Sequence, residues 1–201
     1  MKRTFAVAAA MLACGLGGCA SMMHGEEHSG WVTLFDGRSL DAFDRVGDAN
    51  WRLDEGSVVA TKGTGFLVTK KSYADFEIRA EFWADDNANS GIFIRCEDAV
   101  KHTSVVCNEV NIYDKRPDPL YGTGAIVDVA KVSPMPKAGG RWNTYEIHAK
   151  GDHFVVKLNG VTTADAHDAK HARGLIGLQY APGVVKDSGT IKFRKVEIRA
   201  L

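Results

Sequence analysis

Apolar and polar residues alternate with a period of two along much of the chain. Between residues 76 and 82 every second residue is apolar, and the residues between them are charged. Residues 144–149 and 154–158 follow the same pattern, and the second run leads into Asn159-Gly160, a strong hairpin signal. A period of two places alternate side chains on opposite faces of a strand, so these segments are predicted to be β-strands with one buried face.

Two further strands are predicted at residues 175–180 and 190–200. In the last segment the apolar phase shifts between Phe193 and Val196, which indicates a β-bulge. No segment has a convincing helical period, and the 21 glycines suit a chain with many turns. Many short strands without helices predict an all-β fold, an antiparallel β-sandwich.

The N-terminus has the composition of an export signal. Lys2 and Arg3 precede an apolar run over residues 5–16, which is too short to span a hydrocarbon core of ~30 Å. The run ends in Leu16-Gly17-Gly18-Cys19, which resembles the lipobox of bacterial lipoproteins. We therefore expect residues 1–19 to be a lipoprotein signal peptide and its last residue, the cysteine, to carry the lipid. An ordinary cleaved secretory peptide is the alternative.

The rest of the chain divides into a tether and one domain. Residues 20–30 are polar and without pattern, as in a flexible tether, and residues 31–201 are predicted to form a single domain. Ala20, rather than an acidic residue, follows the cysteine; by resemblance to lipoprotein sorting in two-membrane bacteria, this favours the outer membrane. The domain would then face the periplasm and touch the membrane only through its N-terminal lipid.

The charge and the cysteine content limit the classes of partner and bear on the compartment in which the protein works. The chain has 25 basic and 25 acidic residues and no basic stripe, which argues against nucleic acid as a partner. Cys96 and Cys107 are separated by ten residues, which in an oxidising compartment predicts a disulfide across a hairpin-like loop. Two buried free thiols or a thiolate metal site are the alternatives, although no Cys-x-x-Cys spacing supports the metal.

A series of short motifs lies in order between residues 31 and 201. They include Leu34-Phe35-Asp36-Gly37, Asn89-Ser90-Gly91-Ile92, Glu109-Val110-Asn111-Ile112, Trp142-Asn143-Thr144-Tyr145 and Ile176-Gly177-Leu178-Gln179. Together they resemble the 3-keto-disaccharide hydrolase family. The resemblance implies a concanavalin A-like jelly-roll sandwich whose concave face holds sugars. It also implies activity on glycosides oxidised at C3, by hydrolysis or by elimination followed by hydration.

The chemistry of such a substrate defines the groups that a site needs. A ketone at C3 acidifies the proton on C2 and allows the substituent on C1 to leave. The site needs a base near C2, a positive charge near the C3 oxygen and an acid near the leaving oxygen. Either a fixed cation or a divalent metal could supply the positive charge.

Four side chains are the candidate catalytic residues. Glu109 and Asn111 share a face because they are two residues apart on a predicted strand. Arg95 ends the preceding strand and would supply the fixed positive charge, and His148 alternates outward on another strand. A buried structural ion pair between Glu109 and Arg95, and an ordinary exposed strand histidine at 148, are the alternatives.

Three more residues are candidates for substrate contact: Trp83, which could stack on a sugar ring, Asp114 and Gln179. Glu109 to Asp114 also looks like a weakened Glu-x-Asp-x-x-Glu strand of sandwich-fold glucanases. A retaining glucanase needs two carboxyl groups ~5–5.5 Å apart, and Asn111 replaces the central acid, so that activity is the second enzyme hypothesis.

The same sandwich also serves proteins without catalytic activity, because fold alone does not decide function. A non-catalytic carbohydrate-binding module and an envelope interaction protein without a ligand both remain alternatives. The observation that separates them from an enzyme is whether Arg95, Glu109 and Asn111 converge in one open cleft.

Overall fold

The computed structural model describes residues 30–201 except 99, 102, 104 and 184–188. This part of the chain is all-β, with a single 3₁₀ turn, η1, at Pro119–Tyr121. The strands are β1 (Trp31–Phe35), β2 (Phe43–Gly47), β3 (Arg52–Asp54), β4 (Ser57–Ala60), β5 (Gly65–Thr69), β6 (Phe76–Ala84), β7 (Ser90–Cys96), β8 (Asn108–Ile112), β9 (Trp142–Lys150), β10 (His153–Leu158), β11 (Val161–His167), β12 (Leu175–Tyr180) and β13 (Ile191–Ala200).

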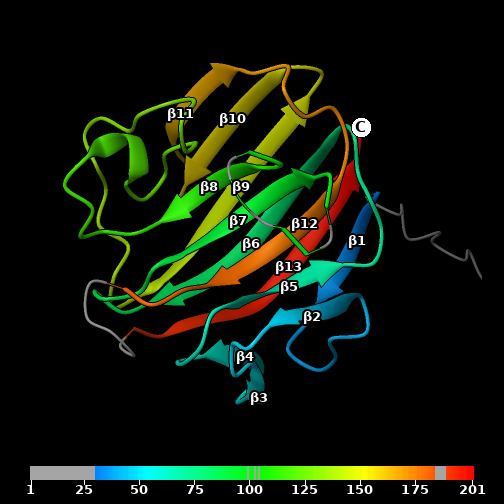
Figure 1. The fold of residues 1–201 in the computed structure, drawn as a ribbon, viewed down its shortest axis with the longest axis vertical. Coiled ribbons are helices and arrows are strands. Elements are labelled where there is room, and N and C mark those ends of the chain that lie inside the picture. The colour runs from blue at the N-terminus through cyan, green and yellow to red at the C-terminus, as the bar shows by residue number, and fades with distance from the viewer. Residues whose placement is uncertain (1–29, 99, 102, 104, 184–188) are drawn as a thin grey trace, which may run out of the picture.

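The strands form two antiparallel sheets, one layered over the other (Figure 1). The large sheet has the order β11-β10-β9-β6-β13-β4-β3, and β1 also pairs with β13. The small sheet has the order β2-β5-β12-β7-β8. These two layers confirm the predicted antiparallel β-sandwich, and each sheet has one inner face and one outer face.

The alternation in the sequence decides which side chains lie between the sheets. On β6, Phe76, Ile78 and Phe82 are fully buried, whereas the charged residues between them face outward. The β10–β11 hairpin turns at Asn159 and Gly160, whose φ angles of 51° and 81° suit a type I′ turn. The strand register of β13 shifts between Phe193 and Lys195, which confirms the bulge.

A second apolar cluster covers part of the outer face of the small sheet. It contains Phe66, Val68 and Phe93 together with Cys96 and Cys107. The two cysteines form a disulfide that joins the last residue of β7 to the residue before β8, with their Cα atoms 4.3 Å apart. The predicted disulfide is therefore confirmed, and it closes one end of this face.

The predicted export signal and its cysteine, Cys19, lie outside the described residues, as does all but the last residue of the predicted tether. Among the residues from 30 onward that the structure describes, none forms a helix long and apolar enough to cross a membrane.

Candidate functional site

Glu109, Asn111 and Gln179 lie on the outer face of the small sheet. On β8, Val110 and Ile112 point into the core, so Glu109 and Asn111 point away from it. On β12, Leu178 is buried in the same core, which turns Gln179 outward. The three polar side chains therefore lie on β8 and β12, the two strands that flank β7.

Two glycines on β7 and β12 reduce the number of side chains on this face near Glu109. Gly91 on β7 pairs with Asn111, and Gly177 on β12 lies beside Phe93. A Cβ atom at position 91 would lie 3.0 Å from Glu109 Oε1, closer than side chains normally tolerate. A residue other than glycine at 91 would therefore have to displace the Glu109 carboxyl group.

The segment after β8 folds back alongside this strand and brings charge near Glu109. The Val127 backbone N–H donates to the Glu109 carbonyl oxygen at 2.9 Å, which fixes this segment against the strand. The next residue, Asp128, has a φ of 61°, and its Oδ1 accepts a hydrogen bond of 2.7 Å from the Tyr121 hydroxyl. Asp128 is thus held in a left-handed conformation close enough for its charge to act on Glu109.

The pKa of Glu109 is raised from an ordinary 4.5 to about 7. Burial of the carboxyl group is the main cause, and the negative charge of Asp128 adds to it. The positive charge of Arg116 opposes both effects only in part. A carboxyl group with a pKa near neutrality can both take and give a proton at physiological pH, which is what general acid–base catalysis needs.

Asn111 and Gln179 differ in how their side-chain amides are used. Asn111 is buried, its Nδ2 donates to the Tyr121 carbonyl oxygen, and its Oδ1 accepts from the Ile112 N–H at 3.0 Å. Asn111 therefore holds the segment after β8 in place. Gln179 Oε1 is buried and has no hydrogen-bond partner among the described residues, so this acceptor is unused.

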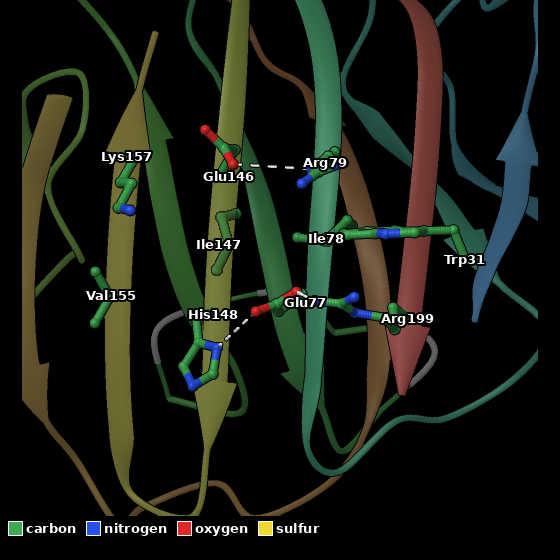
Figure 2. A pocket seen from close by; sticks show the side chains of 10 residues that line it. All are labelled: Trp31, Glu77, Ile78, Arg79, Glu146, Ile147, His148, Val155, Lys157 and Arg199. Carbon is green, nitrogen blue, oxygen red and sulfur yellow. Dashed lines mark hydrogen bonds and ion pairs between the residues drawn. The ribbon is translucent and has the colours of Figure 1, made fainter. Parts of the chain in front are cut away.

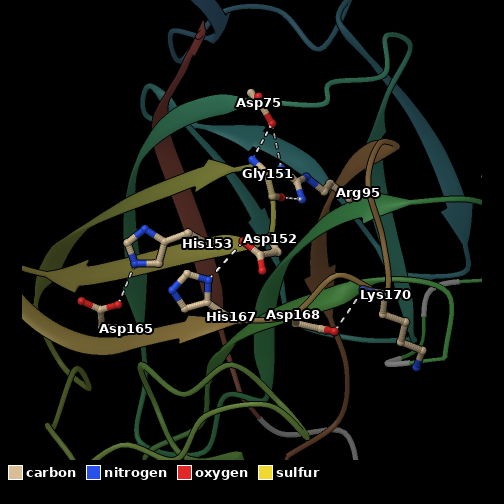
Figure 3. A network of polar contacts seen from close by, with 9 residues as sticks. All are labelled: Asp75, Arg95, Gly151, Asp152, His153, Asp165, His167, Asp168 and Lys170. Atoms are coloured by element: carbon tan, nitrogen blue, oxygen red, sulfur yellow. Dashed lines mark hydrogen bonds and ion pairs between the residues drawn. The ribbon is translucent and has the colours of Figure 1, made fainter.

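Arg95 does not join Glu109, contrary to the expectation from sequence. Its φ of 53° at a bulge in β7 turns the side chain inward, where it is 1% exposed. The guanidinium donates to the carbonyl oxygens of Ala74 and Gly151 at 2.8 and 2.7 Å, and it pairs with Asp75 at 3.2 Å (Figure 3). Arg95 therefore joins strand ends inside the sandwich, and the expected convergence is limited to Glu109 and Asn111.

Asp114 is fully engaged within the protein. Its carboxylate accepts hydrogen bonds from the Thr123 hydroxyl at 2.6 Å and from the N–H groups of Ala138 and Gly139 at 2.7 and 2.8 Å. Asp114 therefore ties two loops together. This structural role explains why an acid stands at the end of the glucanase-like pattern. The structure does not offer it as a second free carboxylate for Glu109.

His148 and Trp83 lie on the outer face of the large sheet, on the other side of the sandwich from Glu109. His148 pairs through Nδ1 with Glu77 at 3.2 Å. Trp83 lies under the Lys192 ammonium, 5.4 Å from the ring centroid, and opposite Trp142 in the strand register. A small substrate at Glu109 cannot reach either side chain.

A pocket of about 320 Å³ opens on that face, around His148 (Figure 2). Its walls combine acids, bases and one indole. It is lined by Trp31, Glu77, Ile78, Arg79, Glu146, Ile147, His148, Val155, Lys157 and Arg199.

Other histidines of the described chain form pairs with carboxylates rather than clusters. His153 contacts Asp165 at 2.7 Å and His167 contacts Asp152 at 3.1 Å, and the two imidazole rings stack (Figure 3). Within the described ranges, no group of three or more histidine, cysteine, aspartate or glutamate side chains is arranged to hold a metal ion.

Asp128, Tyr121 and Arg116 are the residues of this site that sequence reasoning missed. All three lie in the irregular segment between β8 and β9, where no alternation indicates which side chains face the strand. Gly124-Ala125-Ile126, a further motif of the family resemblance, marks this segment in the sequence but does not identify its charged residues.

Comparison with known proteins agrees with the fold and with the motifs. The model of the 3-keto-alpha-glucoside-1,2-lyase-like domain matches residues 30–199. A candidate glycosyl hydrolase from Parabacteroides distasonis is 26% identical, with a TM-score of 0.71 over 85% of this chain and 99% of its own. A second from the same organism is 17% identical, with a TM-score of 0.73 over 86% and 94%.

The carbohydrate-binding module CBM66 from Bacillus subtilis shares the fold at 17% identity, with a TM-score of 0.55 over 85% of this chain and 96% of its own. Among curated proteins, none matches the chain in sequence.

Proposed function

This chain belongs to the 3-keto-alpha-glucoside-1,2-lyase-like domain family, and from that membership we propose that it cleaves glycosides oxidised at C3. The observation that carries the proposal is Glu109: a half-buried carboxyl group on a family motif strand, with a pKa of about 7. A sugar-directed enzyme of this kind would use the outer face of the small sheet.

Glu109 would act as the base. Its carboxylate takes the proton from C2, the electrons of the C2–H bond form the C1–C2 double bond, and the C1–oxygen bond breaks. The leaving oxygen takes a proton from water, and the hydroxide that remains adds to C1 while Glu109, whose carboxyl proton exchanges with solvent, protonates C2. Elimination followed by hydration amounts to hydrolysis of the glycoside, with the base regenerated.

Two neighbours support the charge changes in this scheme. Arg116 is the cation whose charge reaches Glu109, and its guanidinium lies over the rings of Tyr113 and Tyr121 at 5.4 and 5.5 Å. It takes the place that sequence analysis gave to Arg95, near the negative charge that grows on the C3 oxygen. Gln179 would turn its unused acceptor outward to take a sugar hydroxyl.

The test compares oxidised with unoxidised substrates. The full-length protein is incubated with 4-nitrophenyl glucoside and with its 3-keto derivative, with and without divalent metals, and nitrophenol release is measured above the spontaneous rate. We expect turnover of the 3-keto derivative only, and a loss of about 10²–10⁴ in rate for Glu109→Gln. Glu197→Gln, a glutamate on the opposite face, is the matched control and should keep full activity.

A non-catalytic carbohydrate-binding module is the second candidate function. The observation that favours it is that Arg95 and Asp114 are committed to structural contacts, which leaves few converging charges beside Glu109. If the protein binds sugars but turns over neither substrate, binding is the function.

We also propose that the domain is held at the bacterial cell envelope by a lipid on Cys19, in the outer membrane and facing the periplasm. The support is the sequence Leu16-Gly17-Gly18-Cys19 after a charged start and an apolar run.

A further inference from the structure

The pocket on the large sheet has one wall with an unpaired positive charge. Lys157 on β10 lies opposite Glu146 on β9, which in turn lies opposite Arg79 on β6. Glu146 contacts the Arg79 guanidinium at 3.8 Å, so these two charges match each other. Lys157 makes no ion pair among the described residues, and Figure 2 shows its side chain along the edge of the pocket.

The next row of side chains places a histidine diagonally from Lys157. Val155 lies two residues before Lys157, on the same face of β10. Its cross-strand partner is His148. His148 Nδ1 contacts Glu77, and its other ring nitrogen makes no hydrogen bond with a described residue. Val155 is short, so space is left above it beside the lysine ammonium.

Glu77 is a fixed anion on the opposite wall. It accepts a hydrogen bond from Arg199 in addition to its contact with His148. Burial alone would raise its pKa, but the hydrogen bonds and charges of these two partners lower it overall. Glu77 therefore stays ionised and presents acceptor oxygens to the pocket.

Trp31 closes the pocket on the remaining side. Its indole lies between the guanidinium groups of Arg79 and Arg199, at 4.4 and 5.0 Å from the ring centroid. Figure 2 shows the ring extending from β1 over Ile78 on β6. The indole edge and Val155 give the pocket apolar surface between its polar groups.

We propose that this pocket binds a sugar that carries a carboxylate, of the hexuronic acid class, at a site separate from Glu109. The sugar carboxylate lies over Val155 and pairs with the Lys157 ammonium. Its hydroxyl groups donate to Glu77 and Glu146, whose oxygens would repel a simple anion that has no hydroxyls to offer. An uncharged sugar leaves the lysine without a counter-ion and binds more weakly.

The test is calorimetric titration of the full-length protein at low ionic strength with D-glucuronate, D-glucose and acetate. We expect glucuronate to bind at least about tenfold more tightly than either of the others. Glucose lacks the carboxylate that pairs with Lys157, and acetate lacks the hydroxyl groups that donate to Glu77 and Glu146. Lys157→Gln should lower the glucuronate affinity about tenfold, to the level of glucose. Lys157 is exposed, so its replacement should leave the thermal midpoint unchanged.

Two control variants locate the ligand. Lys150→Gln removes an exposed lysine at the end of β9, outside the pocket, and Glu109→Gln alters the opposite face; both should bind glucuronate like the wild type. The proposal is overturned if glucose or acetate binds as tightly as glucuronate, or if glucuronate does not bind. It is equally overturned if Lys157→Gln keeps wild-type affinity, or if Glu109→Gln loses it.

Discussion

The Tyr121 hydroxyl donates a hydrogen bond of 2.7 Å to Asp128 Oδ1, and the charge held there acts on Glu109. The left-handed backbone of Asp128, at φ 61°, is tolerated by aspartate better than by most residues. The pair therefore fixes a negative charge near the carboxyl group that we propose as the catalytic base.

Asp128→Asn should lower the pKa of Glu109, because it removes a negative charge that disfavours the carboxylate. If the carboxylate is the active form, kcat/KM rises with pH through that pKa, and this rise should move to lower pH in the variant. The measurement is the pH profile of kcat/KM on a 3-keto-glucoside. Asp128→Glu keeps the charge and is the control; an identical profile for wild type and Asp128→Asn would contradict the prediction.

The raised pKa of Glu109 also predicts a pH-dependent stability. Between an ordinary pKa of 4.5 and about 7, the folded chain holds a proton on Glu109 that the unfolded chain releases. The contribution of this group to the free energy of unfolding therefore falls as pH rises through that window. In Glu109→Gln no group titrates at this position, so this decrease in stability is absent.

Urea unfolding of wild type and Glu109→Gln at a series of pH values measures this difference. The stability of the variant relative to the wild type should increase by up to about 3 kcal/mol between pH 4.5 and pH 7.5. Glu197→Gln should show no such trend. A pH-independent difference between wild type and Glu109→Gln would mean that the carboxyl group is not buried in solution.

Arg95→Met should destabilise the fold, because it leaves the carbonyl oxygens of Ala74, Gly151 and His171 without their buried donor. The expected loss is about 3–5 kcal/mol in urea unfolding. Arg194→Met removes an exposed arginine that pairs with Glu81 and should cost less than about 1 kcal/mol. Equal losses for the two variants would contradict a structural role for Arg95.

The error at Arg95 shows where alternation stops being informative. On β7, Ile92 and Ile94 point inward and Phe93 outward, as the pattern predicts, so Arg95 should have pointed outward. The bulge at its positive φ turns it inward instead. A bulge of this kind depends on the pairing with β12, which lies about 80 residues further along the chain and is not visible in the local pattern.

The candidate site was predictable in part for a related reason. Strand alternation and the family motif together identified Glu109, Asn111 and Gln179, which do share one face. Alternation also placed His148 on an outer face, but it cannot tell which of two sheets a strand joins. That information lies in the long-range pairing of β6 with β9.

Cys19→Ala should release the protein from the membrane, if a lipid on this cysteine is the anchor as proposed. The measurement is the distribution of the protein between membrane and soluble fractions of cells that express either form. Cys14→Ala, which alters a cysteine inside the apolar run, is the matched control and should stay in the membrane fraction. Membrane attachment of Cys19→Ala equal to that of the wild type would rule out the lipid anchor.

The most direct test of Glu109 as the base follows the hydrogen on C2 of a 3-keto-glucoside during turnover in D₂O. Mass spectrometry and NMR of the recovered substrate and of the sugar product report deuterium at that carbon, after subtraction of the spontaneous exchange. With wild-type protein, we predict deuterium at C2, and with Glu109→Gln we predict none above the spontaneous level. Cleavage by the wild type that leaves the C2 hydrogen in place, or undiminished exchange in the variant, would contradict the account.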